Sequence, residues 1–188
     1  MIRFDHVTFG YEAEHPVLRE LSLEIPEGDR VCLTGASGQG KTTVLRLLLG
    51  LEQPQRGAVI RPEGTRFSVV FQEDRLLPWK TALENAALTG SAEDARCWLT
   101  ELGLGGSLDA LPETLSGGMK RRAALARALA HPFDVLVLDE ALTGLDDAAK
   151  ARCLAAIDRA VGPQKTLVMA CHDPAEAAAL AARTIPVA

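Results

Sequence analysis

The sequence predicts an α/β fold with a central parallel sheet, antiparallel strands added near the N-terminus and a compact helical insertion. Short runs rich in Val and Leu alternate with helical patterns, as in layered folds whose strands are buried on both faces. The strand signal disappears between residues 72 and 132, where helical patterns continue. The length of 188 residues, with 47% hydrophobic residues, suits a single domain with an adequate core.

The expected elements follow in chain order. The segment up to about Pro26 and the turn-rich segment 56–66 are expected to form the added antiparallel strands. Buried parallel strands are expected at 30–34, 67–71, 135–138 and 166–170, and core helices at 41–49 and 147–160. The insertion should contain helices at 81–87, 92–102 and 117–130. The Ala-rich segment 175–183 favours another helix, packed on the core.

Composition and patterning exclude several classes of protein. The net charge of -5 argues against nucleic acid as a partner, because binding a phosphate backbone needs a concentrated positive field. No run of about 18 apolar residues predicts a membrane-spanning helix, and the N-terminus does not resemble a signal peptide. Four widely spaced cysteines without a CxxC pair suggest neither a zinc site nor a disulfide framework, and they fit a reducing compartment: Cys32, Cys97, Cys153 and Cys171.

A glycine-rich loop between a predicted strand and a predicted helix indicates a phosphate-binding site. The loop reads GASGQGKTT and comprises Gly35, Ala36, Ser37, Gly38, Gln39, Gly40, Lys41, Thr42 and Thr43. Its backbone amides would surround a β-phosphate, while Lys41 would reach the β and γ oxygens. The Thr42 hydroxyl would ligate Mg²⁺, and Thr43 would donate to the α-phosphate. The alternative is a plain glycine-rich turn with a solvated lysine.

Two carboxylates follow the apolar strand VLVL, at the edge of the sheet where α/β folds bind their ligands. Asp139 is the candidate Mg²⁺ ligand, and Glu140 is the candidate base that orients or deprotonates an attacking water. The alternative is that these two acids only begin the next loop.

Gln72 and His172 also lie at predicted strand ends. The Gln72 amide could reach the metal or the attacking water, and a neutral His172 imidazole could bond a γ-phosphate oxygen. For each residue the alternative is a purely structural role.

The segment TLSGGMKRRAALARAL, residues 114–129, begins a helix with Ser116 as its expected N-cap. Free amides and a positive helix dipole at such a start can hold an anion. The alternative is a simple cap followed by a solvated basic face.

In this order, the glycine-rich loop, Gln72, LSGG, VLVLDE, the GLD of residues 144–146 and His172 resemble the nucleotide-binding subunit of ATP-binding cassette (ABC) transporters. The LSGG motif is the specific element of this resemblance, which spans nearly the whole chain. It implies a P-loop NTPase with a RecA-like core sheet. One ABC ATPase domain, 1–188, would comprise a core with its β subdomain, 1–72 and 133–188, and a helical subdomain, 73–132.

The resemblance implies an ATPase that uses ATP and Mg²⁺ and pairs head to tail with a second ABC ATPase subunit, identical or different. Ser116, Gly117 and Gly118 would complete the partner's ATP site, and the Asp146 loop would run along the interface. Tyr11 would stack on adenine. Lys41, Gln72, Glu140 and His172 would be catalytic, with Thr42, Gln72 and Asp139 at the metal.

The same resemblance implies permease partners in the membrane, a substrate-binding protein and a cytoplasmic position on the inner face of the cell membrane. Leu77 and Trp79 are candidate anchors in the segment that would receive the permease. The LLPW sequence is similar to importers of nitrate, sulfonate or taurine type.

The sequence departs from the family's pattern at Met119, where glutamine is usual, and at Ala141, where proline often follows the catalytic glutamate. Neither change removes a catalytic group. Two alternatives stay open: a soluble ABC ATPase without a transport role, and a nucleotide-dependent interaction module that does not hydrolyse ATP.

Overall fold

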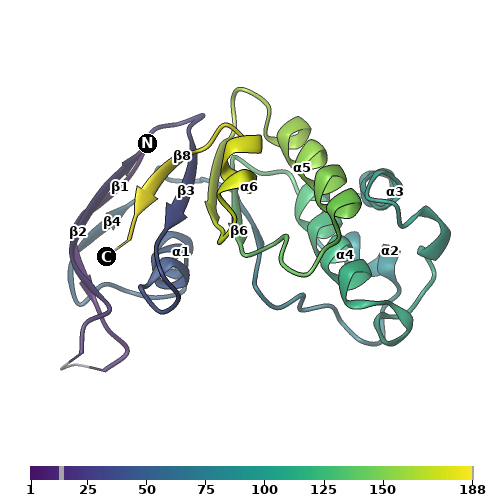
Figure 1. Cartoon of the computed structure of the whole chain (residues 1–188), viewed down its shortest axis with the longest axis horizontal. Helices are drawn as coiled ribbons and strands as arrows, with labels where there is room; N and C mark the ends of the chain where they lie inside the picture. Colours follow the sequence, from purple (N-terminus) through teal and green to yellow (C-terminus); the bar gives the residue numbers. More distant parts are fainter. Residues whose placement is uncertain (13–14, 188) are drawn as a thin grey trace.

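The computed structural model describes residues 1–12 and 15–187, and it contains the predicted parallel sheet (Figure 1). Five strands run in the order β5-β6-β7-β3-β8, and every neighbouring pair is parallel. Their bounds are Arg30–Thr34 for β3, Phe67–Val70 for β5, Val135–Asp139 for β6, Thr166–Ala170 for β7 and Arg183–Pro186 for β8. The α/β prediction is therefore confirmed.

The N-terminal strands form a separate antiparallel sheet in the order β2-β1-β4. Its strands are β1 (Ile2–Phe9), β2 (Leu18–Ile25) and β4 (Arg56–Ile60). In its centre Phe4 lies opposite Leu23 on one side and Val59 on the other. The predicted strand segment 56–66 contains only β4, because Pro62 and Gly64 come soon after that strand and favour a turn.

Alternating side chains of the central strands face two hydrophobic clusters, one on each face of the sheet. In β6, Leu136 and Leu138 belong to the cluster under the helices α4 (Gly117–Ala130) and α5 (Asp147–Val161). Val135 and Val137 belong to the cluster shared with α1 (Lys41–Leu49) and the antiparallel sheet. All residues of β6 and β7 are buried, which explains the apolar runs 135–138 and 167–170 within them.

The helical insertion contains α2 (Ala82–Ala86), α3 (Ala92–Glu101) and α4, with two 3₁₀ turns at Gly105–Ser107 and Pro112–Thr114. No strand occurs between β5 and β6, as predicted for this described part of the chain. Each helix has an N-cap side chain that accepts a backbone N–H: Thr81, Ser91 and Ser116. Buried side chains of α3 and α4 join the cluster beneath the central sheet, so the insertion packs continuously onto the core.

The end of the chain differs from the prediction of one Ala-rich helix. Helix α6 covers only Pro174–Ala179, and Ala181 then adopts a left-handed φ of 50° that reverses the chain. The unpredicted strand β8 follows and pairs with β3. None of the helices in residues 1–12 and 15–187 combines the length and apolar character that crossing a bilayer requires.

Candidate active site

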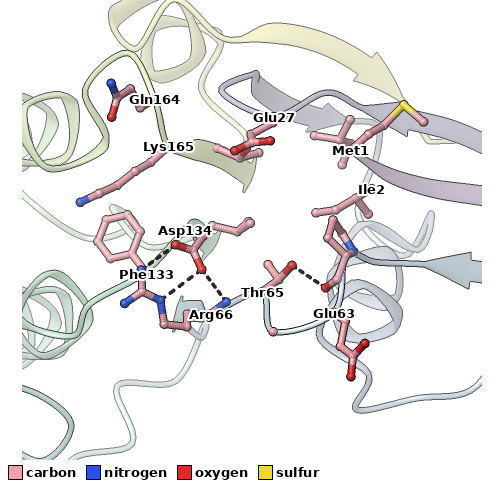
Figure 2. Close-up of a pocket in the computed structure, with 15 residues that line it drawn as sticks. Met1, Ile2, Glu27, Glu63, Thr65, Arg66, Phe133, Asp134, Gln164 and Lys165 are labelled. Atoms are coloured by element: carbon pink, nitrogen blue, oxygen red, sulfur yellow. Dashed lines mark hydrogen bonds and ion pairs between the residues drawn. The ribbon is translucent and has the colours of Figure 1, made fainter.

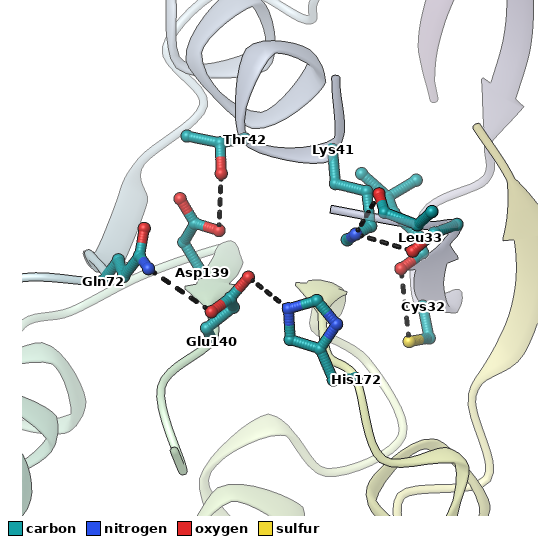
Figure 3. Close-up of polar contacts among 10 residues, drawn as sticks. Cys32, Leu33, Lys41, Thr42, Gln72, Asp139, Glu140 and His172 are labelled. Carbon is teal, nitrogen blue, oxygen red and sulfur yellow. Dashed lines mark hydrogen bonds and ion pairs between the residues drawn. The ribbon is translucent and has the colours of Figure 1, made fainter. Parts of the chain in front are cut away.

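The candidate site lies at the carboxyl ends of four adjacent strands, β5, β6, β7 and β3. The glycine-rich loop follows β3, Glu140 follows β6, and His172 comes two residues after β7. Segments far apart in the sequence meet here because parallel strands bring their carboxyl ends to one edge. Figure 3 shows the resulting cluster of polar side chains.

The glycine-rich loop leaves the start of α1 open to a ligand. Gly40 is the N-cap of α1, with φ 95°. The first amides of a helix have no intrahelical partner, and because no side chain caps α1 they remain available to a ligand. A Cβ on Gly40 would lie 2.8 Å from Leu18 Cδ2, and the positive φ itself disfavours any residue with a side chain. The Ala36 amide donates to Gln39 Oε1 at 2.6 Å, so the Gln39 side chain joins the two sides of the loop.

Lys41 is the buried cation of this loop, with 6% of its surface exposed. Its Nζ donates to the carbonyl oxygens of Gly35 at 2.7 Å and Ala36 at 3.1 Å. These acceptors hold the ammonium beside the loop, where phosphate oxygens would be stronger acceptors.

Asp139 and Thr42 form the oxygen-rich part of the site. The Thr42 hydroxyl donates to Asp139 Oδ1 at 3.1 Å, and burial raises the pKa of the Asp139 carboxyl above its ordinary value. The described residues contain no group of three or more His, Cys, Asp or Glu suited to a metal. A hydroxyl and one carboxylate nevertheless fit Mg²⁺, which is commonly held by one or two carboxylates together with substrate phosphates.

The Glu140 carboxylate is contacted by side chains from two other loops. His172 Nε2 lies 2.7 Å from Glu140 Oε1, and Gln72 Nε2 donates to Glu140 Oε2 at 3.4 Å (Figure 3). Glu140 has a left-handed φ of 50°, an uncommon conformation for a non-glycine residue and one that occurs at functional sites. Its amide donates to the Ala170 carbonyl, which fixes the turn after β6.

Sequence comparisons agree with this arrangement. The sequence profile of the ABC transporter family matches residues 18–143. The aliphatic sulfonates import ATP-binding protein SsuB 1 of Agrobacterium fabrum is 41% identical to the chain, with 98% of this chain and 70% of that protein aligned. The protein of the same name from Rhodococcus jostii is 37% identical, over 98% of this chain and 79% of that protein.

The chain belongs to the ABC transporter family. It is an ATP-binding ATPase cassette, and solved structures agree. The dimeric post-hydrolysis state of the ATP-binding cassette MJ0796 bound to ADP and Pi matches with a TM-score of 0.90 at 27% identity, over 100% of this chain and 94% of that one. Another dimeric MJ0796 structure matches with a TM-score of 0.88 at 28% identity, with the same coverage.

In this ABC ATPase the LSGG motif begins α4 as predicted. The Met119 amide donates to the Ser116 hydroxyl at 3.3 Å, which makes Ser116 the N-cap. Ser116 and Gly117 are exposed, and Gly118 is half-buried. The residue Met119 is half-buried against the core cluster.

The alternative of a solvated basic face on α4 is wrong for all three of its arginines. Arg122 donates to the carbonyls of Leu102 and Gly118. Arg121 and Arg127 donate to carbonyls of the segment 71–75. Arg121 and Arg127 thus satisfy backbone acceptors where the insertion joins the core, and Arg122 does so within the insertion, roles that the sequence did not predict.

Tyr11 and Asp146 have structural contacts of their own. Tyr11 is 56% exposed, lies edge-on to Phe9, and accepts a hydrogen bond from Arg46 Nη1 at 3.1 Å. The Asp146 carboxylate is the N-cap of α5 and accepts from the Ala149 amide. The contact from Arg46 was not predicted, because it joins two residues 35 positions apart in the sequence.

Two cysteines meet beside the site. Cys32 Sγ in β3 lies 3.0 Å from Cys171 Sγ, next to His172. Both are free thiols, and their mutual hydrogen bond together with burial raises the pKa of Cys171. Their separation of 139 positions gave no sequence signal of this contact.

A pocket of about 420 Å³ lies at the opposite, amino-terminal edge of the central sheet (Figure 2). It is lined by residues that precede or begin strands, including Ile2, Arg66, Asp134 and Thr166. Arg66 and Asp134 are paired there, and the pairing lowers the pKa of Asp134 to about 2. Because the motif residues are at the carboxyl edge, this pocket is not part of the candidate active site.

Proposed function

We propose that two copies of this ABC ATPase close head to tail around two MgATP molecules, hydrolyse them and thereby drive a membrane permease that imports a sulfonate-type anion. The observation that carries the hydrolytic part is the convergence of Gln72 and His172 on Glu140, beside the glycine-rich loop. The importer part is supported by relatives named as aliphatic sulfonates import proteins.

The glycine-rich loop would bind the triphosphate. Gly35 to Gln39 are exposed and flank the open amides at the start of α1. The Lys41 ammonium would exchange its two carbonyl acceptors for phosphate oxygens, and Thr43 would donate to the α-phosphate. Thr42, Asp139 and Gln72 would hold Mg²⁺, which neutralises charge on the phosphate oxygens when bound.

Glu140 would act on the attacking water. Its carboxylate would accept the water's proton as the oxygen attacks the γ-phosphorus, with ADP as the leaving group. His172 contacts one carboxylate oxygen and Gln72 the other, so these two side chains set the direction of the base. When ATP binds, the single N–H of a neutral His172 would pass from Glu140 to a γ-phosphate oxygen.

The second copy would complete each site. Ser116, Gly117 and Gly118 at the exposed start of α4 would meet the γ-phosphate held by the partner, where amides and helix dipole favour an anion. The Asp146 loop would lie at the interface, and Tyr11 would stack on adenine. The dimeric form of the structurally similar MJ0796 cassettes supports this arrangement.

Permease subunits would dock on the helical insertion. Trp79 is 71% exposed in the loop before α2, and Leu77 beside it is half-buried. We propose that residues 73–132 form the helical subdomain that transmits motion, with 1–72 and 133–188 as the core. In this proposal the subunit would lie on the inner face of the membrane, with a substrate-binding protein on the other side.

The decisive test compares the steady-state ATPase rates of the wild type and Glu140→Gln. Loss of a general base should lower the rate roughly 10²- to 10⁴-fold. The variant should still dimerise with ATP, as measured by size-exclusion chromatography. Equal nonzero rates would remove Glu140 from the proposed role. Turnover in neither protein would favour the interaction module that binds ATP without hydrolysing it.

Copurification tests the transport role. A tagged wild-type chain should retain a polytopic membrane protein after detergent extraction, and Trp79→Ala should retain less while keeping its ATPase rate. Recovery of no membrane protein with either form would favour a soluble ABC ATPase.

A further inference from the structure

The segment 71–75, which carries Gln72 from β5 into the helical insertion, has no regular secondary structure. Two arginines of α4 hold it through its carbonyl oxygens. Arg121 donates to Phe71 O at 3.0 Å and to Gln72 O at 2.6 Å. Arg127 donates to Asp74 O at 2.9 Å and to Arg75 O at 2.8 Å. Four of the five carbonyls in this segment therefore accept hydrogen bonds from one helix.

Of the two arginines, Arg121 is the one that contacts Gln72, a proposed catalytic residue. Its side chain is 15% exposed, and its Nε lies 3.2 Å from the Asp74 carboxylate, which balances the buried charge. The planar guanidinium reaches two successive carbonyls at once, a geometry that a lysine ammonium cannot reproduce from one flexible stem. The peptide that Arg121 binds is that of Gln72 itself, so movement of Arg121 displaces Gln72.

Helix α4 also connects Arg121 to Ser116, the residue that would contact the partner's ATP. Ser116 caps α4, and Arg121 lies five positions later, on the same rigid helix. A rise of about 1.5 Å per residue places them roughly 7.5 Å apart along its axis. Gln72 in turn donates to Glu140 Oε2. An unbroken series of contacts thus runs from the serine offered to the partner's ATP to the carboxylate that would activate water in the chain's own site.

We propose that Arg121 is a positioning residue that couples the two ATP sites of the dimer. When Ser116 engages the partner's γ-phosphate, α4 shifts, and Arg121 carries the Gln72 peptide with it and aligns Gln72 against Glu140. The inference rests on the proposed dimeric function. It adds that each copy signals occupancy of one site to the other through a single side chain.

The test measures ATPase rate against ATP concentration for the wild type, Arg121→Gln and Arg121→Lys. Lys120→Gln is the matched control, because it removes the same charge from the adjacent position of the same helix. The wild type and the control should be cooperative, with a Hill coefficient approaching the two sites of the dimer. Arg121→Gln should fall to a coefficient of about 1. Its kcat should fall by up to roughly 10²-fold, because a small misplacement of a positioned group can cost that much in rate. ATP binding to the monomer should not change, as measured by calorimetry in a background that carries both Glu140→Gln and Ser116→Asp, which should neither hydrolyse ATP nor dimerise.

A double-mutant cycle separates positioning from a general structural effect. If Arg121 acts through Gln72, Arg121→Gln should cause no further loss of cooperativity or rate in a Gln72→Ala background. Additive losses in the cycle would overturn the proposal, as would wild-type cooperativity in Arg121→Gln. Should Arg121→Gln fail to fold in a thermal unfolding scan, Arg121→Lys is used in the same cycle, since it keeps the charge beside Asp74 but not the double contact.

Failure of the inference can be distinguished from failure of the proposed function. A wild-type chain that does not dimerise with ATP overturns both. A wild type that dimerises and hydrolyses cooperatively, together with an Arg121→Gln variant that matches it in both measurements, overturns only the role of Arg121.

Discussion

His172 Nε2 lies 2.7 Å from Glu140 Oε1, although the two residues follow different strands of the central sheet. The contact ties the proposed base to the end of β7, while Gln72 ties the same carboxylate to the end of β5. The direction of the carboxylate therefore depends on two segments that different parts of the chain can move.

His172→Ala should lower the rate of ATP hydrolysis about 10²-fold, because Glu140 loses the partner that orients it and the γ-phosphate loses a donor. The single-turnover rate of a preformed ATP complex measures this effect. In a Glu140→Gln background the same substitution should add little, since residues that act together are not additive. A full independent loss in that background would contradict the shared role.

Substitutions of Ser116 should separate helix capping from recognition of the partner's phosphate. Ser116→Asp keeps an N-cap acceptor but places a negative charge where the γ-phosphate would lie, so stability should be retained and ATP-dependent dimerisation lost. Ser116→Ala should lower the free energy of unfolding by about 1 kcal/mol through loss of the cap. Chemical denaturation and size-exclusion chromatography in the Glu140→Gln background measure the two effects. Normal dimerisation of Ser116→Asp would exclude this contact with phosphate.

Asn85 should be important for stability, because its fully buried amide organises the loop before α2. It accepts from the Leu77 amide and donates to the carbonyls of Leu77, Lys80 and Thr81. Asn85→Ala leaves buried backbone groups unpaired and should lower the free energy of unfolding by roughly 1–3 kcal/mol. The control is Trp79→Ala in the same loop, which should change it by less than about 0.5 kcal/mol. If Asn85→Ala and Trp79→Ala lowered the free energy of unfolding equally in urea denaturation, the stabilising role of Asn85 would be contradicted.

The pair formed by Arg66 and Asp134 should make stability depend on pH. The side-chain hydrogen bond from Arg66 lowers the pKa of Asp134 to about 2 from an ordinary 3.8. A lowered carboxyl pKa stabilises the fold above the unfolded-state value, and this contribution is lost as pH falls towards the folded-state value. The stability difference between the wild type and Asp134→Asn should therefore be largest above about pH 5 and shrink towards pH 3, as urea midpoints would measure. A constant difference would exclude the carboxylate as its source. Because the pair is exposed, 1 M salt should reduce the difference.

The sequence predicted most elements whose signals are local. Helix α4 begins after Ser116 and ends at Ala130 as expected, because its cap and its helix-forming run are contiguous. The strands β6 and β7 were found from uninterrupted apolar runs. Strand β8 was missed, because RTIP has little apolar character and follows an Ala-rich segment that favours a helix.

The positions of the candidate site residues in the fold were predicted to a similar degree. The motif spacings predicted which residues gather at the carboxyl edge, and Gln72, Glu140 and His172 do meet there. The contacts of Arg121 and the meeting of Cys32 with Cys171 depend on strand order and helix packing. Tertiary structure sets both, and no local pattern records them.

The outer position of β8 affects how the protein behaves at high concentration. An unpaired strand at the rim of a sheet can recruit a second molecule and begin aggregation. Here that strand has only four residues and closes with Pro186, which has no N–H to offer a newcomer. The β8 edge of the parallel sheet is thus poorly suited to growth by strand addition.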